Sequence, residues 1–593
     1  MTQLGIVTFT AIAFLHSWQV PPRQPQAAVP PARGAISGSL VDAARGTPVR
    51  KAIVRLVRTQ PGVVKATTSD AEGRFTFNEL PPGSYQMAAS KPGYLEMVYG
   101  ARQPGVMSPG LGITLAEDQR IEKLSFPLHR GGVISGIVTD EFGEPAYNVP
   151  VRALRFSYRN GERIVAPVGN GTTDDRGAYR LAGLLPGEYI VNAVPRDSVA
   201  TLSAQANEDR QMQAQLASQA RATGDSKAGA ALRERAALVA SLPAPPAVPS
   251  KGYVPMYYPG SAMPSGGTVM NLGLTEERAG IDFSLHVLET ATVAGKVNMA
   301  EGALPDDTRV QLIDPALPVA GVGVWLRNTD PEGRFSFAGV VPGSYVLRAY
   351  TALPLSEGGA VFTASMNVSL GESGLTDIVL TLTRGVPVSG RVALSDLPQP
   401  VDASRIRLRL VRVLSSADWE APPPLVTMDA DGAFQIANVA PGRYQFSMTG
   451  LPDGWTIESA VFGAIDAADR HLDVEQDGTY ANGELKLTNR IAELNGVLST
   501  ITGAPSPDHT VLLFPADRTM WLPRSRRIRM VQAGNDGRYA IKGLPPGDYR
   551  IVAVPSPEPG RESDPAWLSQ LFALSTSLTL RAGEARTQNI TVR

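Results

Sequence analysis

One pattern recurs five times along this chain of 593 residues and constrains its fold more than any other feature. It consists of Asp-x-x-Gly, an alternating apolar segment and Pro-Gly-x-Tyr, with its two glycines ten residues apart in every copy. The copies span 70–85, 174–189, 330–345, 429–444 and 534–549. Repetition at a fixed internal spacing predicts that one structural unit is used five times.

The pattern predicts strands separated by defined turns. Asp accepts backbone N–H groups and Gly adopts positive φ, so Asp-x-x-Gly predicts a hairpin tip, although Gly534 replaces the Asp in the fifth copy. The residues two and four positions after the glycine are apolar, as at Phe75 and Phe77, which predicts a half-buried strand. Pro-Gly predicts a type II turn. The tyrosine then begins the next strand, and we expect its hydroxyl group to reach the backbone near this corner.

Further strands are predicted on both sides of each copy. Upstream lies a short strand that contains one glycine, at Gly38, Gly136, Gly295, Gly390 and Gly496. A second upstream strand follows, and in the fourth copy residues 405–410 alternate Arg with Ile or Leu. Two more strands close each copy downstream. Roughly seven strands in about 100 residues predict an all-β fold of five tandem, seven-stranded, Ig-like β-sandwich units.

We number the predicted units 1 to 5 in chain order. Their bounds are 33–128, 131–287, 290–383, 386–490 and 492–593. Unit 2 is the longest because it contains an insertion, residues 198–242, which is rich in Ala, Gln, Arg and Glu and therefore favours helix. Gly224-Asp225-Ser226 would divide this insertion into two helices, so we predict a helical hairpin that is either docked or projects as an arm. We expect the five units to form an extended or gently bent rod.

Residues 1–32 are predicted to be a signal peptide and a Pro-rich linker. The run from Leu4 to Leu15 is largely apolar and has the length of a signal-peptide core, and a Pro/Gln/Ala-rich stretch follows at 21–31. Met1 to Gly5 has no Lys or Arg, so a buried apolar arm or a misassigned start is the alternative. No later segment approaches the ~20 apolar residues that a membrane-spanning helix needs. We therefore expect a secreted or periplasmic protein whose mature chain has no transmembrane segment.

The charge and the absence of cysteine exclude several classes of function. The formal net charge is −1 at pH 7, so no basic excess favours nucleic acid as the partner. Without Cys, the chain has no disulfide, no thiol nucleophile and no cysteine ligand for a metal. It also lacks the lipid-bearing cysteine of a bacterial lipoprotein. An exported chain of this composition must be held together by its cores alone.

The repeated residues resemble the carboxypeptidase regulatory-like domain, a transthyretin-like sandwich related to carbohydrate-binding-like and Cna-B-type folds. The resemblance rests on the glycine of the first strand, on Asp-x-x-Gly followed by an aromatic residue, and on Pro-Gly-x-Tyr, and it covers nearly the whole chain after the N-terminal segment. It implies an accessory module of bacterial proteins: a folding companion of a peptidase, a surface stalk, an extension of an outer-membrane receptor or a glycan-binding unit.

A search for catalytic motifs leads us to predict no enzyme and no cofactor. The one His-x-x-Glu, from His286 to Glu289, lacks a second histidine in a context that would complete a zinc site. A Gly-x-Ser-x-Gly elbow and a P-loop are absent. Turn chemistry explains the acidic hairpin tips, which supply too few oxygens for calcium. The basic run 524–529 could bind an anion, but a solvated strand face is the simpler explanation.

Aromatic side chains are the best candidates for ligand binding. Trp325, Trp419 and Trp521 lie shortly before the repeated pattern in units 3, 4 and 5, and Tyr257 and Tyr258 lie in a Pro/Gly-rich loop of unit 2. Exposed aromatic rings offer flat surfaces with a polar edge, which suit stacking against sugars. Core filling or packing between units is the alternative.

Three functions follow from these observations. The first is a non-catalytic, exported scaffold or adhesion-type protein that binds other molecules through loops and edge strands. The second is a carbohydrate-binding protein that uses the five aromatic residues to bind a polysaccharide. The third is an accessory subunit of a separately encoded peptidase or outer-membrane transporter, whose partner would be another envelope protein.

Overall fold

In the computed structural model the regular secondary structure of the described residues is almost entirely β-strand, which confirms the predicted all-β sandwich fold class. One α-helix, α3 (Pro565–Phe572), belongs to the last unit. The structure describes residues 34–592 apart from 59–63, 102–103, 105–111, 160–161, 200–229, 232–233, 235–249, 306, 318–322, 354–358, 399–404, 414–423, 425, 507–508 and 556.

Unit 1 contains two sheets that face each other across an apolar core. Its strands are β1 (Gly34–Asp42), β2 (Ile53–Arg58), β3 (Val64–Thr68), β4 (Arg74–Leu80), β5 (Gly83–Ser90), β6 (Met97–Val98), β7 (Ile113–Leu115) and β8 (Arg120–Leu128). One sheet has the order β4-β1-β8, and the other has the order β3-β2-β5-β6 with β7 also paired to β5. β1 is antiparallel to β4 and parallel to β8.

Unit 2 repeats this plan with longer strands and extra short ones. Its strands are β9 (Gly132–Thr139), β10 (Pro150–Arg159), β11 (Glu162–Thr172), β12 (Ala178–Leu184), β13 (Gly187–Ala193), β14 (Lys251–Tyr253), β15 (Met256–Tyr257), β16 (Met270–Leu272), β17 (Glu277–Arg278), β18 (Phe283–Ser284) and β19 (Val287–Glu289). β9 pairs with β12 and with β17 and β18, while β11, β10, β13 and β15 form the second sheet.

Unit 3 differs because its two halves join into one seven-stranded sheet. Its strands are β20 (Ala291–Met299), β21 (Arg309–Ile313), β22 (Val324–Asn328), β23 (Arg334–Val340), β24 (Gly343–Ala352), β25 (Val361–Leu370) and β26 (Leu375–Arg384). The order is β22-β21-β24-β25-β26-β20-β23. β25 joins the two halves because it pairs with β24 along its length and with β26 at one end.

Unit 4 has a six-stranded sheet of order β29-β30-β27-β35-β32-β33 and a three-stranded sheet of order β28-β31-β34. Its strands are β27 (Val386–Val392), β28 (Arg407–Arg412), β29 (Val426–Met428), β30 (Ala433–Val439), β31 (Gly442–Thr449), β32 (Thr456–Phe462), β33 (Ile465–Asp466), β34 (Leu472–Val474) and β35 (Tyr480–Thr488). β29 pairs with β30, whereas the corresponding strand of each other unit pairs with its second strand.

Unit 5 returns to the plan of unit 1 and adds α3. Its strands are β36 (Ala492–Thr500), β37 (His509–Pro515), β38 (Arg529–Gln532), β39 (Arg538–Leu544), β40 (Gly547–Pro555), β41 (Thr576–Leu580), β42 (Ala585–Thr587) and β43 (Ile590–Val592). β36 pairs with β39, β42 and β43, and the second sheet has the order β38-β37-β40-β41. Asp564 caps α3 by accepting a hydrogen bond from the backbone N–H of Ala566.

The glycine in the first strand of each unit permits a close approach of the last strand. A Cβ atom at Gly38 would lie 2.3 Å from the backbone oxygen of Leu124, and one at Gly496 would lie 1.9 Å from that of Gln588. These separations are well below contact distance, so a side chain would force the two strands apart. The repeated glycine is therefore a packing requirement of the parallel pair.

The tyrosine of Pro-Gly-x-Tyr is buried in every unit, and its hydroxyl group donates to a backbone carbonyl four residues earlier. The donors Tyr85, Tyr189, Tyr345, Tyr444 and Tyr549 reach Pro81, Leu185, Val341, Ala440 and Pro545 at 2.5, 2.5, 2.7, 2.8 and 2.7 Å. This is the backbone contact that the sequence predicted. It satisfies a phenol that would otherwise be costly to bury.

The turn before that tyrosine was predicted incorrectly. A type II turn needs a glycine φ of about +80°, whereas φ is +154° at Gly83 and +150° at Gly187, Gly442 and Gly547. This region is open to glycine because it has no Cβ. The hairpin tip, in contrast, has the predicted left-handed glycine, with φ of +75° at Gly73.

Five large clusters of buried apolar residues fill the sandwiches, and each draws its buried members from one predicted unit. A few half-buried neighbours cross between units, such as Val341 of unit 3 against the unit 2 cluster. The alternating residues after each hairpin tip lie in these clusters, as predicted for Phe75 and Phe77. We retain the five-unit division and its bounds as a proposal.

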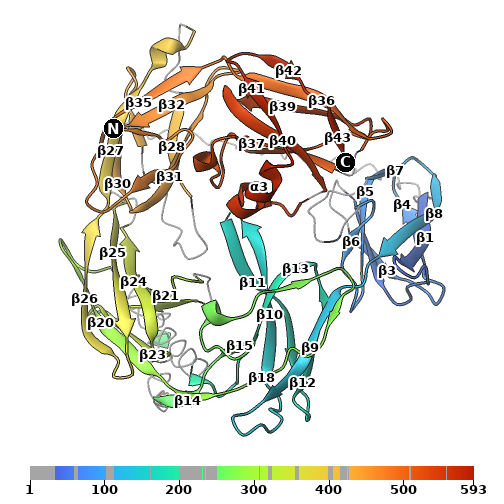
Figure 1. The fold of residues 1–593 in the computed structure, drawn as a ribbon, viewed down its shortest axis with the longest axis horizontal. Helices are drawn as coiled ribbons and strands as arrows, with labels where there is room; N and C mark the ends of the chain where they lie inside the picture. The colour runs from blue at the N-terminus through green and yellow to red at the C-terminus, as the bar shows by residue number, and fades with distance from the viewer. Residues whose placement is uncertain are drawn as a thin grey trace, which may run out of the picture.

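Units 2 to 5 follow one another around a ring, and unit 1 lies outside it (Figure 1). The expected rod is therefore wrong. Arg155 of unit 2 pairs with Glu558 of unit 5, and the two residues are 403 positions apart in the sequence. α3 and the turn before it extend toward β11 of unit 2 and close the ring. A rod would leave the first and last of these four units apart, whereas contacts between their side chains hold them together.

Two predicted segments lie mostly outside the described residues. The signal peptide and linker at 1–32 fall entirely outside them. In the predicted helical insertion, Val199, Ala230, Ala231 and Glu234 are helical, and the hairpin stays a prediction. Within the described part of the chain, no helix is both long and apolar enough to cross a membrane.

Candidate functional site

Two of the three predicted tryptophans, Trp325 and Trp521, lie in the described part of the chain. Trp521 is buried, with 3% of its surface exposed, and its indole N–H donates to the backbone oxygen of Pro515 at 2.8 Å. Trp325 is half-buried against the unit 3 core, and its ring meets that of Tyr345 edge-on with centroids 5.9 Å apart. Trp419 lies outside the described residues. Trp521 therefore offers no ring face to a sugar, because its core position covers both faces.

The two predicted tyrosines also pack inward. Tyr257 is 4% exposed, and burial raises the pKa of its phenol above the ordinary value. Tyr258 is half-buried and meets Phe283 edge-on at 6.3 Å. Tyr257 therefore packs in the interior, which was the alternative to a stacking surface.

The residues considered for metal binding have structural roles. Glu289 pairs with Lys251 at 3.3 Å, and His286 is exposed beside β18. Among the described residues, no three His, Asp or Glu side chains are grouped so that they could hold a metal ion. At the hairpin tips the aspartate serves the turn: Asp174 accepts from the backbone N–H groups of Arg176 and Ala178, each at 2.9 Å.

An arginine lies at the Pro-Gly corner in four of the five units. Its guanidinium group donates to the backbone oxygen of the proline, and we call Arg58, Arg155, Arg412 and Arg527 the corner arginines. Their distances to Pro82, Pro186, Pro441 and Pro546 are 2.6, 2.9, 3.0 and 2.9 Å. A Cβ atom on the corner glycine would lie within 3 Å of this guanidinium group, and the positive φ of the glycine in these four units disfavours any other residue there. In unit 3, a Cβ atom on Gly343 would instead meet the Tyr345 ring and Met263 at ordinary contact distances.

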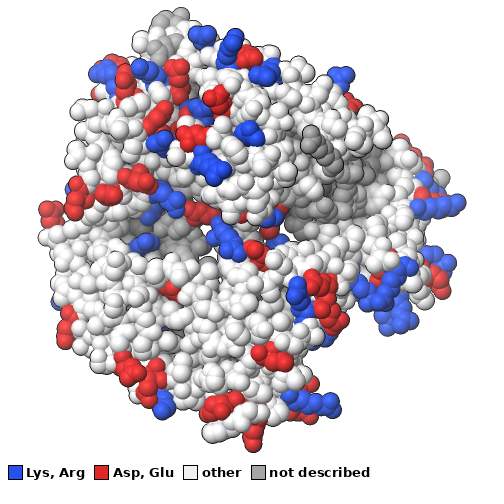
Figure 2. Space-filling model, in the orientation of Figure 1, with Lys and Arg blue, Asp and Glu red and all other residues white. Residues whose placement is uncertain are grey.

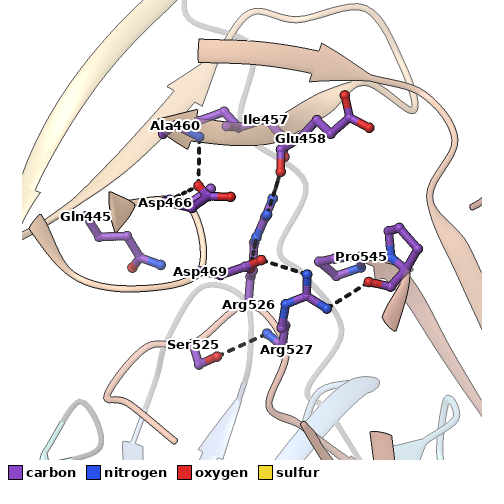
Figure 3. Close-up of polar contacts among 12 residues, drawn as sticks. Gln445, Ile457, Glu458, Ala460, Asp466, Asp469, Ser525, Arg526, Arg527 and Pro545 are labelled. Atoms are coloured by element: carbon purple, nitrogen blue, oxygen red, sulfur yellow. Dashed lines mark hydrogen bonds and ion pairs between the residues drawn. The ribbon is translucent and has the colours of Figure 1, made fainter. Parts of the chain in front are cut away.

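The corner arginine of unit 5 belongs to the basic run 524–529, and it is neither solvated nor free to bind an anion. Arg526 and Arg527 pair with Asp469 of unit 4 at 2.7 and 2.6 Å (Figure 3). Arg526 also donates to the backbone oxygens of Ile457 and Glu458. The three charged side chains are between 9% and 18% exposed. The run therefore joins units 4 and 5.

Burial and hydrogen bonding act in opposite directions on Asp469. Burial raises the pKa of this carboxyl group, but the hydrogen bonds from Arg527 and Arg526 outweigh that effect and hold the pKa below its ordinary value. His471, nearby on the same junction, contacts the backbone oxygen of Pro523 at 3.0 Å. Burial lowers the pKa of His471 and so favours the neutral ring. This ring donates a hydrogen bond from Nε2 to the backbone oxygen of Pro523 across the junction.

The corner arginine of unit 2 closes the ring. Arg155 donates to both carboxylate oxygens of Glu558 at 3.0 and 3.2 Å while it keeps its bond to Pro186. Tyr158 donates to Asp564 at 2.7 Å, and burial raises the pKa of its phenol. These side chains are charged or polar and only partly exposed, so each needs the partner that the other unit supplies.

A groove lies beside the junction of units 4 and 5, on the outer face of β31. It has a volume of about 400 Å³, and its lining includes Gln445, Ser447, Thr449, Trp455 and Arg526. β28 runs along one side: Arg409 is directly paired with Ser447, and Arg407 with Thr449. Sequence reasoning found the basic face of β28 but missed Trp455, because Trp455 lies outside the repeated pattern.

The family resemblance is confirmed at the first unit. Residues 35–121 match the family model of the carboxypeptidase regulatory-like domain. Colossin-A of Dictyostelium discoideum is 27% identical over 165 residues, which are 27% of this chain and 2% of Colossin-A. The chain thus spans a small fraction of the length of this curated relative.

Solved structures with a similar β-fold include bacterial pilins. GBS52, the minor pilin of Streptococcus agalactiae, is 12% identical with a TM-score of 0.21, covering 43% of this chain and 97% of that one. A streptococcal ancillary pilin is 12% identical with a TM-score of 0.18, covering 59% and 99%. A DUF3823 family protein of Bacteroides uniformis is 16% identical with a TM-score of 0.15, covering 28% and 88%. These TM-scores are too low to support any conclusion about function.

Proposed function

We propose that the chain is a non-catalytic, multi-domain scaffold or adhesion-type protein of the cell envelope. It acts as a compact ring of four sandwiches that carries unit 1 at its outside. The pair of Arg155 with Glu558 supports this proposal more than any other observation, because it joins units that are distant in sequence. A ring holds the loops of its units in fixed relative positions, as a platform for partners requires.

Two further observations support the proposal. The charged residues that sequence reasoning considered for binding, at 524–529, are used to join units 4 and 5. The family matched by residues 35–121 is described as regulatory-like, which agrees with an accessory module. The apolar run at residues 4–15 supports export.

Small-angle X-ray scattering of the full chain tests the ring. A closed ring has a smaller radius of gyration and maximum dimension than five sandwiches in a line. We expect the compact profile, and a profile of a flexible or extended chain would contradict the proposed platform.

Cell fractionation tests the envelope role. A C-terminally tagged chain expressed in its native cells is expected in the periplasm, in the medium or at the surface, with a new N-terminus within the first 32 residues. A full-length chain confined to the cytoplasm would overturn the envelope proposal, whatever the scattering profile shows.

A further inference from the structure

The groove beside β31 is lined by polar and apolar side chains and lies next to contacts with other units of the ring. From β31, Gln445, Ser447 and Thr449 supply polar groups to the lining, and Phe446 and Met448, which also pack with the unit 4 core, supply apolar ones. On the same face, Arg443 pairs with Glu162 of unit 2 at 2.9 Å. Gln445 also donates to the backbone oxygen of Arg524 in unit 5. The groove thus presents two hydroxyl groups and an amide on a surface whose position is fixed by three units.

Two arginines of β28 are paired with residues that line this groove. Directly paired residues of an antiparallel sheet point to the same face with Cβ atoms about 5 Å apart. The pairing of Arg409 with Ser447 and of Arg407 with Thr449 therefore puts both arginines on the same face as these two lining residues, next to the groove. Arg407 and Arg409 are exposed, while the alternate residues Leu408 and Leu410 are buried. Figure 2 shows Lys and Arg side chains interspersed with Asp and Glu over one face of the molecule.

An indole also lines the groove. Trp455 is half-buried and lines the groove with Arg526. The guanidinium group of Arg526 is already bound to Asp469 and to the backbone oxygens of Ile457 and Glu458, so it belongs to the junction of units 4 and 5. The groove therefore combines an aromatic ring in its lining with the neighbouring basic residues of β28.

We propose that this groove binds an acidic polysaccharide, such as a chain of uronic acid residues. Guanidinium groups bind carboxylates in a two-pronged geometry. Ser, Thr and Gln side chains can both donate to and accept from sugar hydroxyl groups, and an indole offers an apolar surface with a polar edge to a sugar ring. A volume of about 400 Å³ falls within the range of small-ligand sites.

The same geometry favours a sugar over a peptide that adds a strand. An extended peptide binds by pairing with an exposed sheet edge. β31 is paired on both sides, with β28 and with β34, so the groove floor offers side chains and no free backbone. An acidic peptide is thus the rival that the experiment must test.

Isothermal titration calorimetry on the full chain tests the proposal with defined probes. Oligogalacturonate is the acidic sugar, a maltooligosaccharide of equal length is the neutral sugar, and oligoglutamate is the acidic peptide. We expect oligogalacturonate to bind at least tenfold more tightly than either of the others, and its binding to weaken as salt is added.

Two variants locate the site, and a third is the matched control. Arg409→Glu and Trp455→Ala are each expected to weaken oligogalacturonate binding at least tenfold. Arg538→Glu makes the same charge change at an exposed pair with Asp536 in unit 5 and should leave binding unchanged. Arg409 is exposed, so Arg409→Glu keeps the test informative if Trp455→Ala disturbs the unit 4 core, where Trp455 also packs.

Three outcomes would overturn the proposal: no binding of oligogalacturonate, equal binding of oligoglutamate, or equal loss in Arg409→Glu and Arg538→Glu. Binding of the neutral sugar that Arg409→Glu leaves unchanged would also overturn it. Scattering is measured on the same samples, so failure of the groove and failure of the ring are separate results.

Discussion

Units 1 and 2 each have a Pro-Gly-x-Tyr corner of the same construction, but of these two only the corner of unit 2 contacts a distant part of the chain. Arg58 and Arg155 each donate to the proline oxygen of Pro-Gly, and Tyr85 and Tyr189 each donate to the backbone four residues earlier. Arg155 additionally holds Glu558 of unit 5. For Arg58, the described residues contribute no carboxylate partner.

The comparison separates two roles of one residue type. Capping the proline oxygen is local and belongs to the folding of each unit. Binding a carboxylate from another unit is a second role, which units 2 and 5 have acquired at Arg155 and Arg527. Unit 1 lies outside the ring, and its Asp42 accepts from Tyr94 of the same unit at 3.0 Å and from Arg130 of the connection to unit 2 at 2.8 Å.

The largest loss of stability is expected at the most buried ion pair between units, that of Asp469 with Arg526 and Arg527. Asp469→Ala leaves Arg526 and Arg527 without their carboxylate, which costs roughly 3–5 kcal/mol when such a pair is buried. Urea unfolding of the full chain, monitored in units 4 and 5 by hydrogen exchange, measures the loss of unfolding free energy. Asp536→Ala removes an exposed partner of Arg538 and should cost less than about 1 kcal/mol. Equal effects of the two variants would contradict the proposed junction.

Acid should weaken the same junction in a defined direction. The pKa of Asp469 lies below its ordinary value of 3.8 in the folded protein. Its contribution to stability is therefore complete above that value and is lost as the pH falls through the lower folded pKa. Unfolding of wild type and Asp469→Asn, compared from pH 6 to pH 2, should show the stability difference shrinking only at the acid end.

The next largest effect is expected from a substitution that breaks the contact between units 2 and 5 but leaves the Pro-Gly corner of unit 2 intact. Glu558→Ala removes the partner of Arg155, whose bond to Pro186 remains, and should cost about 2 kcal/mol in the contact between units. We expect the radius of gyration from X-ray scattering to rise. Arg58→Ala is the control, since it should weaken unit 1 without changing the ring. An unchanged profile for Glu558→Ala would show that other contacts suffice to close the ring.

A smaller and equal effect is expected at the tyrosines of the two corners. Tyr85→Phe and Tyr189→Phe each remove one hydroxyl bond of 2.5 Å, and each should cost about 1 kcal/mol within its own unit. Hydrogen exchange of the two units measures both. A much larger loss in unit 2 would mean that the ring contact depends on the corner tyrosine as well.

The smallest effect is expected at His471. Burial lowers its pKa, so the unfolded chain binds a proton first as the pH falls below the ordinary value of 6.5. Stability of the junction of units 4 and 5 should be complete above pH 6.5 and decline as the pH falls toward the lower folded pKa. His471→Gln should remove this dependence in melting curves between pH 7.5 and pH 5. A decline of equal size in the variant would assign it to other groups.

Much of each sandwich followed from the sequence because its determinants are close along the chain. The alternation at Phe75 and Phe77 placed both rings in the core, and the tyrosine hydroxyl group found its backbone partner four residues away. The corner arginine was missed, although it ends the second strand in units 1 and 4. The type II turn was predicted wrongly because the corner glycine adopts φ of +150° to +154° in four units, a region open to glycine that the Pro-Gly pattern does not distinguish from a type II turn.

The candidate sites were less predictable. Trp521 and Tyr257 looked like free aromatic residues in loops, but satellite clusters of apolar residues on the outer faces of units 5 and 2 bury them. Trp455 gave no signal, since nothing in the repeat marks its position. Its relation to Arg409 depends on the sheet register and on the loop that follows β31.

The sequence by itself determined an all-β sandwich fold whose repeated pattern has a glycine hairpin tip and a corner tyrosine bonded to the backbone. Short-range turn chemistry and alternating burial decide these features. Only the tertiary structure decided that the array closes, because Arg155 and Glu558 are 403 residues apart and meet through the summed angles between units. No local sequence pattern specifies the sum of these angles between units. The same reason explains why the run 524–529, basic in sequence, serves as a junction once Asp469 of the neighbouring unit is in place.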